Sequence, residues 1–189
     1  MTTGNAMMWV AGMLGGIVLW TLLEYVLHRF VFHGRALGRT LAKEHIQHHA
    51  AVDYFAPALR KAAYALPVLA VICTLAALPL GVALGTSVPF GVATGWLIYE
   101  VIHRRIHTHA PLGRYGAWAR RHHLLHHFGR ADSNHGVTSP MWDVVFGTLA
   151  ERQTIRVPRR HASKFPWLVR ADGETSRIVP AYESDYQLA

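Results

Sequence analysis

Histidine is the residue type whose number and spacing in this sequence could support chemistry. The chain holds 14 histidines among 189 residues, and 13 of them fall between His28 and His135. Most occur in four tight groups, at positions 28–33, 45–49, 103–107 and 122–127. Neutral imidazole is the commonest nitrogen ligand for first-row transition metals. The sequence therefore predicts a metal centre built from imidazole side chains.

The spacing within each group indicates how the rings are presented. Residues three or four apart share one face of an α-helix, so each HxxHH group predicts a face of three ring nitrogens. His28 and His33 are five apart, which is about 140° around an ideal helix. We expect this pair to serve different metal ions or to flank a helix end. The predicted ligands, enough for two ions with open positions, are His28, His33, His45, His48, His49, His103, His107, His123, His126 and His127.

Other polar residues beside these groups are candidates for an extra ligand or for a supporting position behind the ligands. They are His122, His135, Asn134 and Asp143. We expect the two remaining histidines, His109 and His161, to be exposed to solvent and outside the site.

Two acidic residues precede ligand groups by one helical turn. Glu24 lies four residues before His28, and Glu100 lies three residues before His103. Ligating histidines usually donate their second ring N–H to a carboxylate or carbonyl group, so we expect these acids to orient the two rings. An interfacial position or a structural salt bridge with a neighbouring arginine is the alternative.

Charge is distributed unevenly along the chain. No charged residue precedes Glu24, and none occurs from Ala62 to Tyr99, a stretch of 38 residues. One membrane span needs about 20 residues, so the second stretch predicts two spans joined by a turn. Pro79, Gly81, Gly85 and Pro89 supply turn residues near its middle.

The 19 lysines and arginines occupy two blocks, Arg29–Lys61 and Arg104–Arg177. The positive-inside rule places both blocks on the cytoplasmic side of a membrane. A helix near Ala6–Phe32 would then run inward, and a hairpin near Ala62–Ile106 would run out and return. Attraction to anionic lipid head groups accounts for the formal net charge of +8, so no nucleic-acid partner is expected.

These patterns predict an all-α, integral-membrane, multi-pass helical bundle of about three to four membrane helices. A histidine-rich helical cap, with helices around Leu41–Ala50 and Tyr115–His127, is expected on the cytoplasmic face. Residues 1–150 form the predicted membrane-embedded catalytic domain, and residues 151–189 form a polar C-terminal tail or cap. Because prolines interrupt the tail, we expect it to be irregular or partly mobile.

Five stretches carry a family resemblance. They are LWTLLEYVLHRFVFH at 19–33, HIQHH at 45–49, YEVIHRRIH at 99–107, HHLLHHF at 122–128 and GVTSPMWDVVFGT at 136–148. In this order they resemble the fatty acid hydroxylase/sterol desaturase superfamily, and most closely the catalytic domain of fatty acid 2-hydroxylases. HxxHH alone is a weak motif, but four histidine boxes with this spacing followed by GVTSPxWD are specific.

The resemblance implies a di-iron oxygenase that uses O2 and electrons to hydroxylate a lipid acyl chain. It assigns the ten box histidines to the ten predicted ligands given above. Zinc is an alternative occupant in purified protein, because imidazole also accepts zinc. The chain has no room for the haem-binding electron-donor domain found in many eukaryotic members, so a separate electron-donor protein is expected. His135 stands where the family more often has an aromatic or apolar residue.

Three alternatives stay open at this point. A carotenoid-ring hydroxylase shares the style of the histidine boxes, and a sterol or lipid desaturase shares the metal core. A non-enzymatic membrane metal-binding protein, such as a sensor or transporter component, would use the same ligands. A transporter should place its ligands near the middle of the bilayer, whereas these ligands gather at one predicted face.

Overall fold

The computed structural model describes residues 3–172 and 175–189. The chain forms two compact units, one made of Met1–Glu24 with Ala56–Glu100 and the other of Tyr25–Phe55 with Val101–Ala189. All ten predicted ligands belong to the second unit. We describe each unit by itself.

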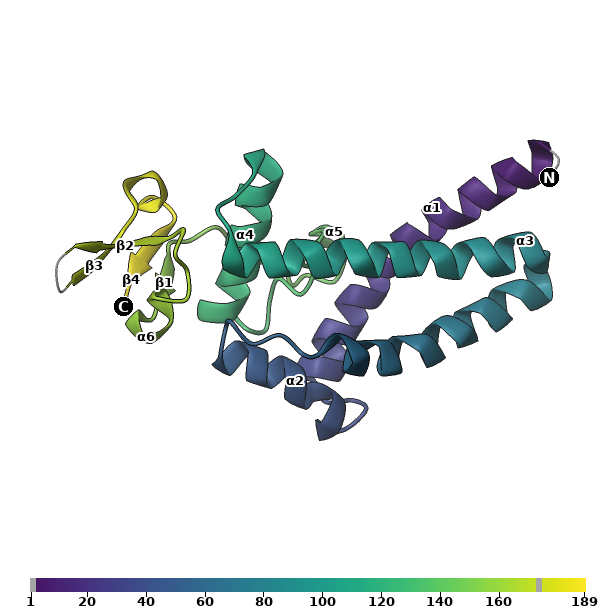
Figure 1. Cartoon of the computed structure of the whole chain (residues 1–189), viewed down its shortest axis with the longest axis horizontal. Coiled ribbons are helices and arrows are strands. Elements are labelled where there is room, and N and C mark those ends of the chain that lie inside the picture. The colour runs from purple at the N-terminus through teal and green to yellow at the C-terminus, as the bar shows by residue number, and fades with distance from the viewer. Residues whose placement is uncertain (1–2, 173–174) are drawn as a thin grey trace. The chain divides into compact units, whose positions relative to one another are not determined.

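The first unit is made from helix α1 (Thr3–Val26) and helix α3 (Ala58–Thr108). Helix α3 is interrupted at Gly81, where φ is 78° and ψ is 173°, a backbone conformation that glycine adopts at little cost. The interruption divides α3 into arms 58–80 and 82–108, which fold back beside each other (Figure 1). A Cβ atom on Gly85 would lie 2.4 Å from the Cβ of Ala77, so the arms touch near the turn. The sequence-predicted hairpin is present.

Both helices are long and apolar enough to cross a membrane. The segments Thr3–His33 and Ala58–Thr108 reach mean hydropathies of 1.9 and 2.4, and 11% of each most apolar window is buried. Core helices of soluble proteins are mostly buried, so this exposure fits a lipid environment better. They count as two candidate spans, the second of which holds the two arms joined at Gly81; the number of three to four membrane helices stays a prediction.

Helix α1 packs against the second arm of α3 through glycine. A Cβ atom on Gly16 would lie 2.1 Å from the backbone oxygen of Val88, and one on Gly91 would lie 2.1 Å from that of Met13. Only glycine permits this approach, which is the close packing that small residues provide between membrane helices.

The histidine region of the second unit contains the end of α3, which carries His103 and His107, and four shorter helices. They are the π-helix η1 (Leu27–His33), α2 (Arg39–Ala50), α4 (Gly113–Phe128) and α5 (Met141–Val145). The helices predicted around Leu41–Ala50 and Tyr115–His127 are confirmed, each slightly longer than expected.

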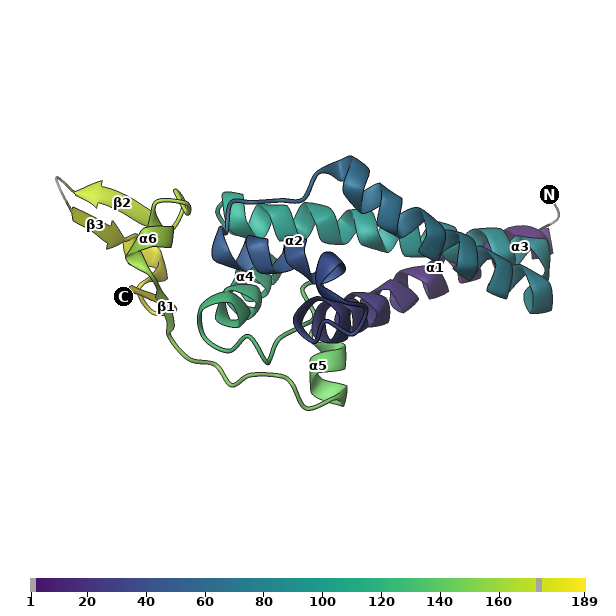
Figure 2. The same ribbon diagram turned by 90° about the horizontal axis from the view of Figure 1, so that it is seen from below.

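The described part of the C-terminal segment, residues 151–172 and 175–189, forms helices and strands, so the prediction that it is irregular is wrong. It contains β1 (Ile155–Val157), α6 (Arg159–Ala162), β2 (Val169–Asp172), β3 (Thr175–Ile178), η2 (Pro180–Tyr182) and β4 (Tyr186–Leu188). β1 pairs in parallel with β4, and β2 pairs antiparallel with β3, beside which it lies in Figure 2. A small apolar core is buried here, made of Phe165, Leu168 and Tyr186. This core stabilises the folded tail although prolines interrupt its helices and strands. The all-α prediction therefore describes residues 1–150 and not the tail.

Candidate metal centre

Ten histidines converge in two clusters of five. The ligand atoms within each cluster all lie within 4.8 Å of one another. The His33 cluster contains His28, His33, His45, His49 and His126. The His107 cluster contains His48, His103, His107, His123 and His127. These are the ten residues predicted from the sequence, brought together by four helices.

The two HxxHH groups are divided between the clusters, which corrects the prediction that each forms one three-nitrogen face. His45 and His49 of α2 contribute to the His33 cluster, whereas His48 contributes to the His107 cluster. Successive residues are about 100° apart around a helix, so His48 and His49 diverge while residues 45 and 49 stay aligned. Helix α4 repeats the pattern in reverse, with one ring in the His33 cluster and two in the other.

The π-helix explains why His28 and His33 act together. In a π-helix the backbone bonds join residues five apart, and Gly34 N–H accordingly donates to Arg29 O at 2.9 Å. His28 and His33 therefore share a face, with ring centroids 5.1 Å apart. Both rings lie in one cluster, against the expectation that they serve different ions, and both lie inside the Leu27–His33 helix, so the alternative of a helix end between them is also wrong.

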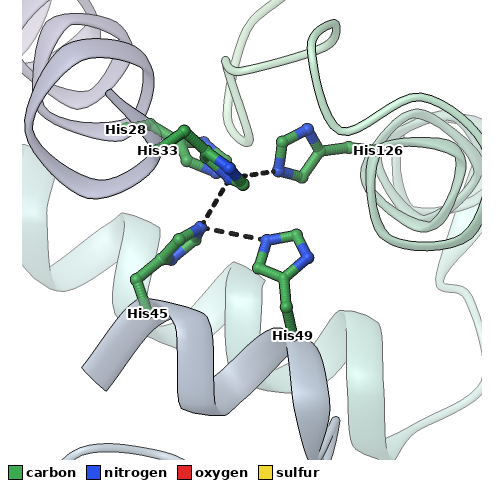
Figure 3. Close-up of side chains that lie close together, drawn as sticks. All are labelled: His28, His33, His45, His49 and His126. Atoms are coloured by element: carbon green, nitrogen blue, oxygen red, sulfur yellow. Dashed lines mark hydrogen bonds between the residues drawn. The ribbon is translucent and has the colours of Figure 1, made fainter. Parts of the chain in front are cut away.

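The rings of the His33 cluster point their Nε2 atoms at one another (Figure 3). His33 Nε2 lies 2.9 Å from His126 Nε2 and 2.9 Å from His45 Nε2, and His45 Nε2 lies 3.0 Å from His49 Nε2. His28 Nε2 is buried and has no hydrogen-bond partner among the described residues.

The His107 cluster has the same geometry. His107 Nε2 lies 3.2 Å from His48 Nε2 and 3.1 Å from His123 Nε2. His127 Nε2 lies 3.0 Å from His123 Nε2. A metal–imidazole bond of about 2.1 Å places adjacent octahedral ligands about 3 Å apart, so both sets of nitrogen atoms fit around one ion each.

Backbone carbonyl groups fix the tautomer of three ligands. The Nδ1 atoms of His28, His48 and His126 face the carbonyl oxygens of His135, Tyr54 and Ser133 at 2.5, 2.7 and 2.7 Å. A carbonyl oxygen only accepts, so each Nδ1 carries the proton and each Nε2 presents a lone pair. This is the usual second interaction of a metal-bound histidine.

The electrostatics also favour neutral rings. Burial, followed by repulsion from neighbouring histidines, holds the pKa values of His45, His123, His126 and His127 well below the ordinary value. The same causes lower the pKa of His49 to about 3. Neutral imidazole is the form that binds metal, so the protonation states match the donor geometry.

Asp143 and His122 lie behind the clusters and belong to neither. Asp143 is fully buried, and its carboxylate accepts from His135 N–H and Gly136 N–H, both at 2.8 Å. Thr148 Oγ1 donates to it at 2.7 Å, and His122 Nε2 lies 3.3 Å away. Burial raises the pKa of Asp143, but these hydrogen bonds outweigh burial and keep it below the ordinary value.

Asn134 and His135 support the site differently, Asn134 through its side chain and His135 through its backbone. Asn134 adopts a positive φ of 54°; its side chain donates to His122 O at 3.1 Å and accepts from Ala150 N–H at 2.8 Å. The His135 ring lies outside both clusters, with its centroid 5.4 Å from that of His28. Its carbonyl oxygen is the group that contacts a ligand.

The two acids expected to orient rings do not share one role. Glu24 is buried, but the Nδ1 proton of His28 goes to His135 O. Glu100 accepts from Lys61 Nζ and from Trp96 Nε1, the latter at 3.2 Å. For Glu100 the contacts favour a salt bridge, with Lys61 in place of the expected arginine.

The remaining histidines divide. His109 is exposed as predicted. His161 is buried, with an exposed fraction of 7%, so the prediction of solvent exposure is wrong. Its ring packs on Phe128 and accepts from Arg160 Nε at 3.1 Å, because the tail folds where an exposed segment was expected.

Sequence reasoning missed the residues that support the second cluster. Phe55 packs on His48 and His103, and Phe165 from the tail stacks on His107 at 6.0 Å between centroids. Arg120 is buried and donates to Ile106 O and Arg105 O, both at 3.0 Å, at the end of α3. The signal available in the sequence was an arginine close to the candidate ligand histidines; its burial is known only from the structure.

Comparison with known proteins places this geometry in a family. The fatty acid hydroxylase family model matches residues 13–148. A dihydroceramide fatty acyl 2-hydroxylase of Arabidopsis thaliana is 31% identical over 153 residues, covering 77% of this chain and 62% of that protein. Human fatty acid 2-hydroxylase is 31% identical over 141 residues, covering 71% of this chain and 38% of that protein.

A solved structure agrees with the sequence matches. It is described as full-length scs7p with only the hydroxylase domain visible, and it superposes with a TM-score of 0.65 at 26% identity, covering 77% of this chain and 57% of that one. The chain thus spans about three fifths or less of the length of these relatives. The matched residues include all ten clustered histidines and the Asp143 segment, and the chain belongs to the fatty acid hydroxylase family.

Proposed function

We propose that this chain is a membrane-bound oxygenase that hydroxylates the acyl chain of a lipid, as the names of its fatty acid 2-hydroxylase relatives suggest. The observation that carries the proposal is the pair of five-histidine clusters within a chain of this family. Hydroxylation with O2 needs a reductant, and we propose that a separate donor protein supplies the electrons.

The ten clustered histidines would hold two iron ions, five ligands to each. Bound iron supplies the oxidising chemistry by activating O2 toward a C–H bond. Zinc would also be accepted by these nitrogens, so the metal found after purification depends on supply. The donor set supports this assignment. The Nε2 atoms are neutral and face one another, so their lone pairs can all coordinate one cation in each cluster.

The chain's own residues would hold the rings and exclude water. Carbonyl groups of His135, Ser133 and Tyr54 fix three imidazoles in the tautomer that presents Nε2. Phe55 and Phe165 cover the His107 cluster with apolar surface. Such a dry, oriented site restricts oxidation to a chain placed beside it.

Membrane attachment would come from the apolar helices. We propose that α1 and the two arms of α3 cross the bilayer and that the basic blocks keep the histidine site at the cytoplasmic face. In this arrangement residues 1–150 form the catalytic part, and residues 151–189 form a folded cap.

Lipid mass spectrometry of cells that express the intact protein or the His126→Ala/His127→Ala variant tests the proposal. This variant removes one ligand from each cluster. Gain of one oxygen atom on an acyl chain, only with the intact protein, is the expected result and identifies the lipid. Loss of two hydrogen atoms would indicate a desaturase, and a change confined to carotenoids would indicate a ring hydroxylase. Identical lipids, with both proteins expressed and reductant supplied, would contradict an enzymatic role.

A further inference from the structure

We infer that Asp143 is a positioning residue for one metal only: by holding the backbone of residues 133–136, it sets the affinity of the His33 cluster and leaves the His107 cluster unaffected. The inference rests on the proposed metal-binding function. It goes beyond that function by making the two sites separable.

The first step is the attachment of two ligands to one short backbone segment. His28 and His126 both belong to the His33 cluster, and their Nδ1 atoms donate to the carbonyl oxygens of His135 and Ser133. In the other cluster, His48 Nδ1 donates to the carbonyl oxygen of Tyr54, which lies outside this segment. The 133–136 segment therefore holds ligands of one cluster.

The second step is how that segment is held. The N–H groups of His135 and Gly136 both donate to the Asp143 carboxylate, one to each oxygen. A Cβ atom on Gly136 would lie 2.1 Å from Ser139 O and 3.1 Å from Asp143 Oδ2, so the turn is closed tightly around the carboxylate. Asn134 fixes the other side through His122 O and Ala150 N–H.

The third step is the support of the carboxylate itself. Thr148 Oγ1 donates to Asp143 Oδ1, so the 3.0 Å contact between Tyr25 and Thr148 must use the Tyr25 hydroxyl proton. Arg29 Nη1 in turn donates to Tyr25 Oη at 2.7 Å. A partly buried chain of hydrogen bonds thus runs from the Arg29 guanidinium to the Asp143 carboxylate, and Asp143→Asn removes the negative charge at its end.

Replacing Asp143 with Asn keeps the shape but removes one acceptor oxygen. One of the two backbone N–H groups then faces an amide N–H₂, and the segment must move. Loss of an outer hydrogen bond to a ligating histidine typically costs on the order of 10- to 100-fold in metal affinity. None of the contacts described for Asp143 reaches a ligand of the His107 cluster, so that cluster should keep its affinity.

The experiment uses the full chain in detergent, loaded with Co²⁺ and followed by visible absorption and by metal analysis. The intact protein should bind two ions, and Asp143→Asn should bind one tightly and one on the order of 10- to 100-fold more weakly. Asp132→Asn is the matched control, since Asp132 is exposed and its carboxylate accepts from nearby Arg130; it should bind two ions normally.

Two double variants assign the weakened site. Asp143→Asn combined with His127→Ala, which damages the His107 cluster, should leave no tight site. Asp143→Asn combined with His33→Ala should retain the one tight site of His33→Ala alone. Equal weakening of both sites, or two tight sites in Asp143→Asn, would overturn the inference.

A milder substitution tests the inference in case Asp143→Asn fails to fold. Thr148→Val removes a single donor to Asp143 and should weaken the same site less. Loss of both ions in this variant would also count against the inference. Failure of the intact protein to bind two ions would instead contradict the proposed function, so the two failures are distinguishable.

Discussion

The imidazole of His28 donates from Nδ1 to the backbone carbonyl of His135 at 2.5 Å, and the His135 side chain takes no part in this contact. The sequence suggested His135 as an eleventh ligand. The structure shows that the position supports a ligand through its main chain, which any residue type could provide.

Substitution of His135 therefore tests a backbone role against a side-chain role. His135→Phe should retain both metal ions, because the carbonyl oxygen persists and a buried Nδ1 atom without a partner among the described residues is removed. His28→Ala should lose one of two ions. Metal content per chain is the measurement, and loss of an ion in His135→Phe would restore the side chain as a ligand.

Adjacent histidines in α2 should give separable metal losses. His48→Ala removes a ligand from the His107 cluster, and His49→Ala removes one from the His33 cluster. Each variant should lose about half of the bound metal, and the double variant should lose nearly all of it. Metal analysis with cobalt spectroscopy checks this. If the single and double variants bind as much metal per chain as the intact protein, the clusters are not metal sites.

Metal removal should destabilise the folded chain. Ten neutral imidazoles face one another at close range, and bound cations would offset the repulsion of their lone pairs. A ligand present at about 100 times its dissociation constant stabilises by about 2.7 kcal/mol per site. Thermal unfolding before and after chelation, with metal re-added as the control, should show a reversible fall in the midpoint. An unchanged midpoint would argue against tight binding.

Arg120 should be needed for the end of α3, where His103 and His107 lie. Its guanidinium donates to carbonyls of Ile106, Arg105 and His109 and lies 4.1 Å from the Trp167 ring centroid. Lysine lacks this planar fork, so Arg120→Lys leaves buried carbonyl groups unsatisfied and should cost about 2–4 kcal/mol.

The neighbouring Arg121 is the matched control. It makes one 3.5 Å, partly exposed contact with Asp185, so Arg121→Lys should cost less than about 1 kcal/mol. Thermal unfolding of both variants measures the difference, and equal destabilisation would contradict a special role for Arg120.

The close packing of α1 on α3 should depend on one glycine and not on its neighbour. A Cβ atom on Gly16 would lie 2.1 Å from Val88 O, whereas one on Gly15 would meet nothing within 4 Å. Gly16→Ala should therefore destabilise by about 1–3 kcal/mol, and Gly15→Ala should be neutral or slightly stabilising. Unfolding midpoints in detergent compare them; a neutral Gly16→Ala would show that the helices separate easily.

Much of the site was predictable from local pattern. The i, i+3 and i, i+4 spacing identified eight of the ten candidate ligands, because helix geometry decides which side chains can converge. The uncharged stretches and the turn residues around Gly81 identified the helical hairpin, because backbone groups in an apolar medium must be satisfied within helices. These signals depend on residues near one another in sequence.

The sequence could not say which histidine belongs to which cluster. His28 and His33 come together only because η1 is a π-helix, and the divergence of His48 from His49 acquires meaning only when two other helices supply their partners. The buried Asp143, the ordered tail and the inward position of His161 likewise depend on contacts between residues far apart in the chain. Residue spacing thus determined the chemistry available, and tertiary packing decided how it was divided between two sites, since partners distant in sequence leave no local pattern.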